Sequence, residues 1–166
     1  MQLTGKEIIE RGVVTNYDPA SGIQQQGVDL RVKNISVVYG PGYVWNERKT
    51  TPAKTKPINL NDDVILLPPG YYELELMEGC AIPDNIAAYI KTRSSLIRCG
   101  AIIHSGQFDG GFHTDNMGCF LQVLCPVYIE IGSRVGQLIC HTSSAVENTY
   151  NGQWQNDVQR KRNNKE

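Results

Sequence analysis

The sequence lacks both a long apolar run and an excess of charge of one sign. No apolar stretch approaches the roughly 20 residues that cross a bilayer. The start, Met1-Gln2-Leu3-Thr4, has neither the basic nor the apolar region of a secretory signal. The formal net charge is −1 over 166 residues, so the basic field that general nucleic-acid binding requires is missing. We therefore expect a cytoplasmic protein that has neither a membrane nor a nucleic acid as partner.

Cysteine is present, but not in a pattern that binds a metal or builds disulfides. The five cysteines are odd in number and stand at no metal-ligand spacing: Cys80, Cys99, Cys119, Cys125 and Cys140. Apolar neighbours, as in Leu124-Cys125-Pro126, predict buried and reduced thiols. The lack of a Cys-x-x-Cys pair argues against the zinc-dependent class of cytidine deaminase.

The apolar pattern predicts one mainly β domain. Thr4 and Glu7 have the spacing of a capping box, which indicates one short helix from about Gly5 to Arg11. Beyond it, several stretches alternate apolar and polar residues with the period of a strand: Val28 to Val32, Tyr72 to Leu76 and Val127 to Ile131. Many short strands after one leading helix predict a closed or sandwiched antiparallel fold.

Other segments depart from this alternation. Ile86 to Ile90 is apolar throughout and predicts a strand buried on both faces, whereas Tyr39 to Lys56 predicts a long loop or loose hairpin. The strand pattern ends near Ser144, and the basic residues Arg160, Lys161, Arg162 and Lys165 follow in a polar tail. We therefore expect a β domain over residues 1–147 and a tail over residues 148–166.

Three clusters could carry chemistry, and each also has a plainer structural interpretation. Arg93-Ser94-Ser95, followed by Arg98, offers forked and hydroxyl donors to a phosphate, or is a helix start capped by a serine. Phe108-Asp109-Gly110-Gly111-Phe112 could place a carboxylate and a ring around a small ligand, or is an Asp-Gly turn. Tyr150 to Gln155 brings aromatic residues into a polar tail, which either docks on the domain or closes over a ligand.

The order of these clusters resembles that of the motifs in the dUTPases and dCTP deaminases. The matching segments, in family order, are Gly27-Val28-Asp29-Leu30-Arg31, Arg93-Ser94-Ser95-Leu96, Asp109-Gly110-Gly111-Phe112, Gly132-Ser133-Arg134-Val135-Gly136-Gln137-Leu138 and the tail from Tyr150. The resemblance covers nearly the whole chain, and the opening segment and the tail are most similar to the deaminase branch. It implies a dUTPase-like distorted jelly roll, or β-clip barrel, and a homotrimer with active sites at the subunit interfaces.

The resemblance also implies roles for individual residues. The triphosphate of dUTP or dCTP would be bound by Arg93, Ser94, Ser95 and Gln137. Mg²⁺ would bridge the phosphate oxygens without a direct protein ligand, and only Asp29 is a candidate for contact with the ion. The nucleoside would be enclosed by Phe108, Phe112, Tyr150 and Trp154. The catalytic candidates are Asp109, which would activate the attacking water, together with Gln122 and Arg98.

One position departs from the deaminases. They need a glutamate on the strand after the third motif, but here that place reads Phe120-Leu121-Gln122-Val123. A carboxamide cannot serve as a general base near neutral pH, and losing that base removes about 10²–10⁴-fold of rate. The resemblance therefore implies hydrolysis of dUTP to dUMP and diphosphate. The alternatives are a dCTP deaminase, which could also be bifunctional, and a nucleotide-binding regulator without turnover. The hairpin from His104 to Asp109 is shorter than in the deaminases, which leaves uracil, cytosine or a modified pyrimidine open as the base.

Overall fold

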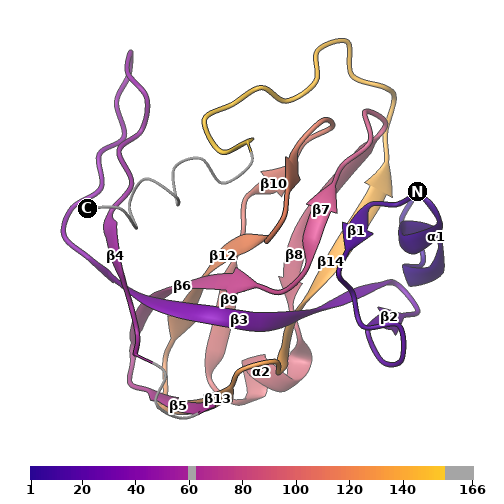
Figure 1. Ribbon diagram of the computed structural model, residues 1–166. Helices are drawn as coiled ribbons and strands as arrows, with labels where there is room; N and C mark the ends of the chain where they lie inside the picture. Colours follow the sequence, from indigo (N-terminus) through magenta and orange to yellow (C-terminus); the bar gives the residue numbers. More distant parts are fainter. Residues whose placement is uncertain (60–62, 156–166) are drawn as a thin grey trace.

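One long strand, β3 (Gly27–Tyr39), runs through both halves of a curled antiparallel sheet (Figure 1). The computed structural model describes residues 1–59 and 63–155. The first part of β3 pairs with β14 (Arg134–Thr142), and its second part pairs with β6 (Gly70–Leu76) and β4 (Lys54–Pro57). The register shifts between Val32 and Asn34, where β3 begins its pairing with β6. The sheet can therefore curl around a single core.

The other strands extend this sheet or form two small sheets beside it. In the large sheet the order is β10-β8-β14-β3-β6-β12-β9, with β2 and β4 also paired to β3. Its remaining members are β2 (Ile23–Gln24), β8 (Ile86–Thr92), β9 (Ala101–His104), β10 (Gln107–Phe108) and β12 (Gly118–Val123). The small sheets are formed by β1 (Val14–Thr15), β7 (Gly79–Ala81) and β11 (His113–Thr114), and by β5 (Val64–Leu67) and β13 (Val127–Glu130). The prediction of a mainly β fold is confirmed.

Period-two alternation decides which face of β6 and β12 meets the core. On β12 the buried residues are Cys119, Leu121 and Val123, and Phe120 and Gln122 point the other way. On β6 the buried residues are Tyr72, Leu74 and Leu76, which leaves Tyr71 and Glu73 on the outer face. The outer face of this part of the sheet therefore carries aromatic and polar side chains rather than a uniformly charged surface.

The N-terminal helix forms where the capping box predicts it. Helix α1 (Gly5–Glu10) begins after Thr4, whose hydroxyl accepts from the Glu7 amide while the Glu7 carboxylate accepts from the Thr4 amide at 2.8 Å. It ends at Arg11 and Gly12, and Gly12 takes a positive φ of 67°. In the described part of the chain, no helix is long and apolar enough to cross a membrane.

A second helix, α2 (Ser94–Arg98), corrects the expectation of a single helix. Its N-cap is Arg93, and no side chain caps it, so the serine-capped start is also wrong in detail. With five residues α2 is too short to produce a helical repeat in the sequence. It is stabilised instead by tertiary contacts such as the buried Leu96.

Two further expectations need correction, and one is confirmed. Strand β8 is not buried on both faces, because Tyr89 is 39% exposed and stacks on His141 with ring centroids 5.9 Å apart.

Cys99 and Cys125 are exposed, although Cys80, Cys119 and Cys140 are buried as expected. Burial raises the pKa of the Cys140 thiol to about 12, which keeps it protonated. The loose hairpin expected from Tyr39 to Lys56 is the β3–β4 connection.

Candidate active site

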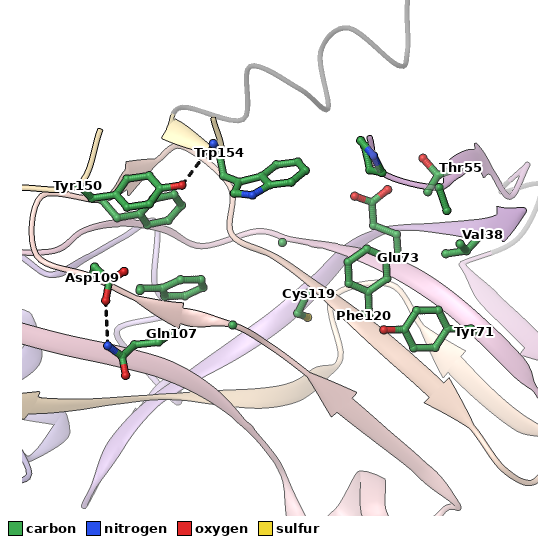
Figure 2. A pocket seen from close by; sticks show the side chains of 16 residues that line it. Val38, Thr55, Tyr71, Glu73, Gln107, Asp109, Cys119, Phe120, Tyr150 and Trp154 are labelled. Carbon is green, nitrogen blue, oxygen red and sulfur yellow. Dashed lines mark hydrogen bonds between the residues drawn. The ribbon is translucent and has the colours of Figure 1, made fainter. Parts of the chain in front are cut away.

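A cavity of about 470 Å³ lies over the outer face of the sheet, beside the Asp109 turn and under the C-terminal segment (Figure 2). Its lining comes from β3, β4, β6, β10 and β12, from the loops before β4 and on either side of β10, and from the tail: Val38, Pro52, Ala53, Thr55, Tyr71, Glu73, Gly106, Gln107, Phe108, Asp109, Phe112, Gly118, Cys119, Phe120, Tyr150 and Trp154. Five of the predicted site residues therefore lie around one cavity: Phe108, Asp109, Phe112, Tyr150 and Trp154.

Asp109 lies at one end of this cavity, on the turn that follows β10. The Asp109 carbonyl accepts from the Phe112 amide at 3.0 Å, and Gly111 takes a φ of 92°, a conformation that favours glycine. The Asp109 side chain is exposed, and its carboxylate accepts from the Gln107 amide at 2.8 Å. The sequence predicted an Asp-Gly hairpin turn here. The turn is present, but it is not a hairpin, because β10 pairs with β8 and β11 pairs with β7. The turn presents the Asp109 carboxylate to the cavity.

The C-terminal segment docks on this turn. The Tyr150 amide donates to the Gly110 carbonyl at 2.8 Å, and the Gln155 side chain donates to the Gly111 carbonyl at 2.9 Å. The Tyr150 ring meets Phe112 edge-on with centroids 5.5 Å apart, and Phe112 stacks on Phe108 at 5.2 Å. Trp154 is 42% exposed and lies over the middle of the cavity (Figure 2). The predicted basic cluster from Arg160 to Lys165 lies outside the described residues.

A second group of site residues gathers around Asp29, whose side chain is fully buried. The two carboxylate oxygens of Asp29 form ion pairs with Arg93 Nε at 3.4 Å and with Arg134 Nη1 at 3.3 Å. They also accept hydrogen bonds from the side-chain amides of Gln137 and Gln24, each at 3.1 Å. A buried carboxylate needs this kind of compensation. The contacts hold Arg93 and Gln137 side by side, at the junction of β3, β14 and the start of α2.

The remaining phosphate-binding candidates lie on α2. Ser94 and Ser95 are exposed on its first turn, and Arg98 is exposed in its last. None of these three residues lines the cavity, and neither do Arg93 and Gln137. One chain therefore presents two separate groups, one around Asp109 and one around Asp29.

Gln122 belongs to neither group. It lies on β12, and its Oε1 is 3.0 Å from His104 Nε2 on the neighbouring strand β9. Since an amide oxygen can only accept, His104 donates in this contact. Gln122 does not line the cavity. The structure therefore does not bring Gln122 and Asp109 together.

Several residues of these two groups were missed in the sequence. The cavity is also lined by four residues that lie on four different strands and belong to no common local motif: Tyr71, Phe120, Val38 and Thr55. Arg134 lies in the fourth motif, three residues before Gln137, and its charge was the signal that could have identified it. Glu73, the second carboxylate of the cavity lining, stood on the polar side of a predicted strand.

The described residues contain no cluster of three or more His, Cys, Asp or Glu side chains that could hold a metal ion. Asp29 was the one candidate for contact with Mg²⁺, but both of its oxygens are already occupied by cationic and amide donors. A directly bound hard cation would have to displace these donors. Among the described residues, the side chains around Asp29 therefore do not fit a directly bound Mg²⁺.

The comparisons of this chain with a family model and with known relatives agree with one another. A family model described as dCTP deaminase-like matches residues 2–143. A probable deoxyuridine 5'-triphosphate nucleotidohydrolase of Methanosarcina acetivorans is 36% identical over 150 residues, covering 84% of each chain. Its counterpart in Aeropyrum pernix is 31% identical over 160 residues, covering 95% of this chain and 99% of that one.

A solved structure shows the same fold. The 2'-deoxycytidine 5'-triphosphate deaminase of Agrobacterium tumefaciens superimposes with a TM-score of 0.63 at 16% identity, over 89% of this chain and 49% of that one. This chain thus spans about half the length of that deaminase chain. At such low identity the likeness concerns the fold alone. The extent of the family match and the relatives above 30% identity together mean that this chain belongs to the dCTP deaminase-like family.

Proposed function

We propose that the protein hydrolyses dUTP to dUMP and diphosphate. The observation that carries this proposal is the exposed carboxylate of Asp109 at the end of an aromatic-lined cavity, combined with an amide at Gln122 that is bonded to His104 outside it. A carboxylate can accept a proton from an attacking water, and an amide cannot. The relatives named as dUTP nucleotidohydrolases support the same reaction.

The cavity supplies binding and orientation for the nucleoside. Phe112 would pack under the deoxyribose, and the backbone of Gly106 and Gln107 would meet the pyrimidine. Trp154, already over the cavity, would cover the base. Asp109 would then orient and deprotonate the water, while the Gln107 amide keeps its carboxylate in place.

The triphosphate would be bound by the Asp29 group together with α2. Arg93, Gln137, Ser94 and Ser95 supply forked, amide and hydroxyl donors, and Arg98 adds a charge at the end of α2. Asp29 acts here as a positioning residue that holds Arg93 and Gln137. Mg²⁺ arriving on the nucleotide would neutralise phosphate charge and withdraw electrons from the scissile bridge.

We further propose that the active unit is a homotrimer, because the phosphate donors do not line the cavity of their own chain. Light scattering should give about three times the 18.5 kDa of one chain. Mixing refolded Asp109→Asn and Arg93→Ala chains, each inactive alone, should restore activity, since random assembly leaves about a quarter of the sites intact. An active monomer, or a mixture without activity, would refute the shared site.

The proposed reaction is tested by identifying products. Purified protein is incubated with dUTP and Mg²⁺, and with dCTP in parallel, and the nucleotides are resolved by ion exchange. We expect dUTP to disappear into dUMP with one diphosphate per turnover. If dUTP stays intact while it binds, the protein is instead a nucleotide-binding regulator.

One observation keeps dCTP deamination as the second candidate. Glu73 lines the same cavity and points into it from the outer face of β6 (Figure 2). A carboxylate there could exchange protons with a cytosine ring, the task that Gln122 cannot perform. Conversion of dCTP to a uracil nucleotide, abolished by Glu73→Gln, would establish this reaction.

A further inference from the structure

Three side chains form a row across the adjacent strands β3, β14 and β8 (Figure 1). Asp29 on β3 pairs with Gln137 on β14, and Gln137 pairs in turn with Lys91 on β8. Side chains at paired positions of antiparallel strands project from the same face of a sheet. Asp29 and Gln137 are joined by their hydrogen bond of 3.1 Å. Lys91 therefore lies beside Gln137, on the side away from Asp29.

The Lys91 ammonium has no partner within residues 1–59 and 63–155. The residue is exposed, and no described residue forms an ion pair with it. Its neighbours on the same face carry no acid, since they are Tyr89, Gln137 and Arg93. The acid of the row, Asp29, is already shared by two arginines. Lys91 thus adds an unpaired cation to a group that is already basic.

Lys91 and Arg93 project in the same direction. The backbone at Arg93 is still extended, with φ −68° and ψ 142°, so the alternation of β8 continues through Thr92 to Arg93. Thr92 points the other way, and its hydroxyl bonds to the backbone of Ile103 on β9. Two cations on one face repel each other when no acid lies between them. This placement therefore favours the binding of an anion that contacts both.

We propose that Lys91 binds the triphosphate directly and sets the preference of the site for a triphosphate over a monophosphate. This inference rests on the proposed function, which places the triphosphate at the Asp29 group and α2. Asp29 offsets the charge of one of its two arginines, whereas nothing offsets the charge of Lys91. Its ammonium has three donors on a flexible stem, so it can follow phosphate oxygens that the fixed fork of Arg93 does not reach.

The charge of Lys91 selects for the number of phosphates. A triphosphate carries more negative charge than the monophosphate product, so an added cation stabilises the bound triphosphate more. The neutral donors of Gln137, Ser94 and Ser95 distinguish the two ligands less by charge. Lys91 does not line the cavity that would hold the nucleoside. Removing its charge should therefore weaken binding of the phosphate chain and leave binding of the nucleoside unchanged.

The test is Lys91→Met, which removes the charge and keeps an unbranched stem. Calorimetry with excess Mg²⁺ measures binding of inorganic tripolyphosphate, of the α,β-imido form of dUTP and of dUMP. We expect the first two dissociation constants to rise at least about tenfold, the scale of one charge-assisted hydrogen bond. That of dUMP should change by less than about threefold. Lys91→Arg keeps the charge and should retain wild-type values within about threefold.

Lys6→Met is the matched control, because it removes the same charge from α1, where the Lys6 side chain is 81% exposed and pairs with Glu10 at 3.6 Å. It should leave all three constants unchanged, which separates a local contact from an effect of net charge. In Lys91→Met, KM for dUTP should rise about tenfold while kcat and the free energy of unfolding stay near the wild-type values. A merely structural role would lower the free energy of unfolding instead.

The outcomes separate this inference from the proposed reaction. Wild-type affinity for tripolyphosphate in folded Lys91→Met protein, or an equal loss for dUMP, would overturn the role of Lys91 and leave the hydrolase intact. If the variant loses tripolyphosphate affinity but the wild type does not hydrolyse dUTP, the proposed function fails and the phosphate contact of Lys91 stands. If the wild type binds neither tripolyphosphate nor the dUTP analogue, both proposals fail.

Discussion

Replacing Asp109 with asparagine is expected to lower kcat for diphosphate release by about 10²–10⁴-fold, with little change in nucleotide affinity. The amide keeps the shape of the carboxylate but cannot accept the proton of the attacking water. The phosphate donors around Asp29 are untouched by the change. Steady-state kinetics of diphosphate release, with calorimetry for dUTP binding, measures both quantities.

Asp115→Asn is the matched control for this variant. Asp115 is an exposed carboxylate in the segment that follows the Asp109 turn, and it does not line the cavity. We expect its kcat to stay within a factor of about two, as is usual for a surface substitution away from the site. Normal kcat in Asp109→Asn, or a large loss in Asp115→Asn, would move the catalytic carboxylate elsewhere.

Asp29→Asn is expected to destabilise the fold by about 3–5 kcal/mol, the cost of breaking a buried ion pair by removing one partner. Arg93 and Arg134 would then face each other without the intervening negative charge, and the donors would lose their common anchor. KM for dUTP should therefore rise more than kcat falls. Urea denaturation gives the free energy of unfolding, and kinetics on the folded fraction gives the KM.

The control for this variant is Asp63→Asn, which changes an exposed acid and should alter the stability by less than about 0.5 kcal/mol. A folded Asp29→Asn protein with reduced kcat and unchanged KM would show that Asp29 acts in the chemical step. If Asp29→Asn has the same free energy of unfolding as the wild type, the contacts around Asp29 do not stabilise the fold.

The limits of the sequence are clearest in β3. The alternation from Val28 to Val32 predicts a short strand, whereas β3 continues to Tyr39 because it changes partners from β14 to β6 and β4. Such long-range pairings leave no trace in local periodicity. The same holds for β8, where an unbroken apolar run hides the exposed ring of Tyr89. By contrast, the capping box of α1 and the Asp-Gly turn are set by neighbouring residues and were predictable.

The residues of the candidate site also fall into those that local motifs predict and those that only the strand pairing brings together. Asp109, Phe112 and Trp154 were predictable from the order of short motifs, and they line one cavity. The rest of the cavity lining was not, since Val38, Tyr71 and Phe120 become neighbours only through the register of β3, β6 and β12. The position of Gln122 also needed the structure. The sequence identified an amide where the deaminases have an acid, but its bond to His104 depends on the β9–β12 register.

The central claim, that this chain releases diphosphate from a uracil nucleotide instead of deaminating cytosine, is tested most directly by two rates from one preparation. Diphosphate from dUTP and ammonia from dCTP are measured under the same Mg²⁺ and pH. We predict rapid diphosphate release from dUTP and no ammonia from dCTP above the rate without protein. Ammonia from dCTP with no dUMP from dUTP would contradict it and would place a proton-transferring acid in the cavity, with Glu73 as the residue to replace first.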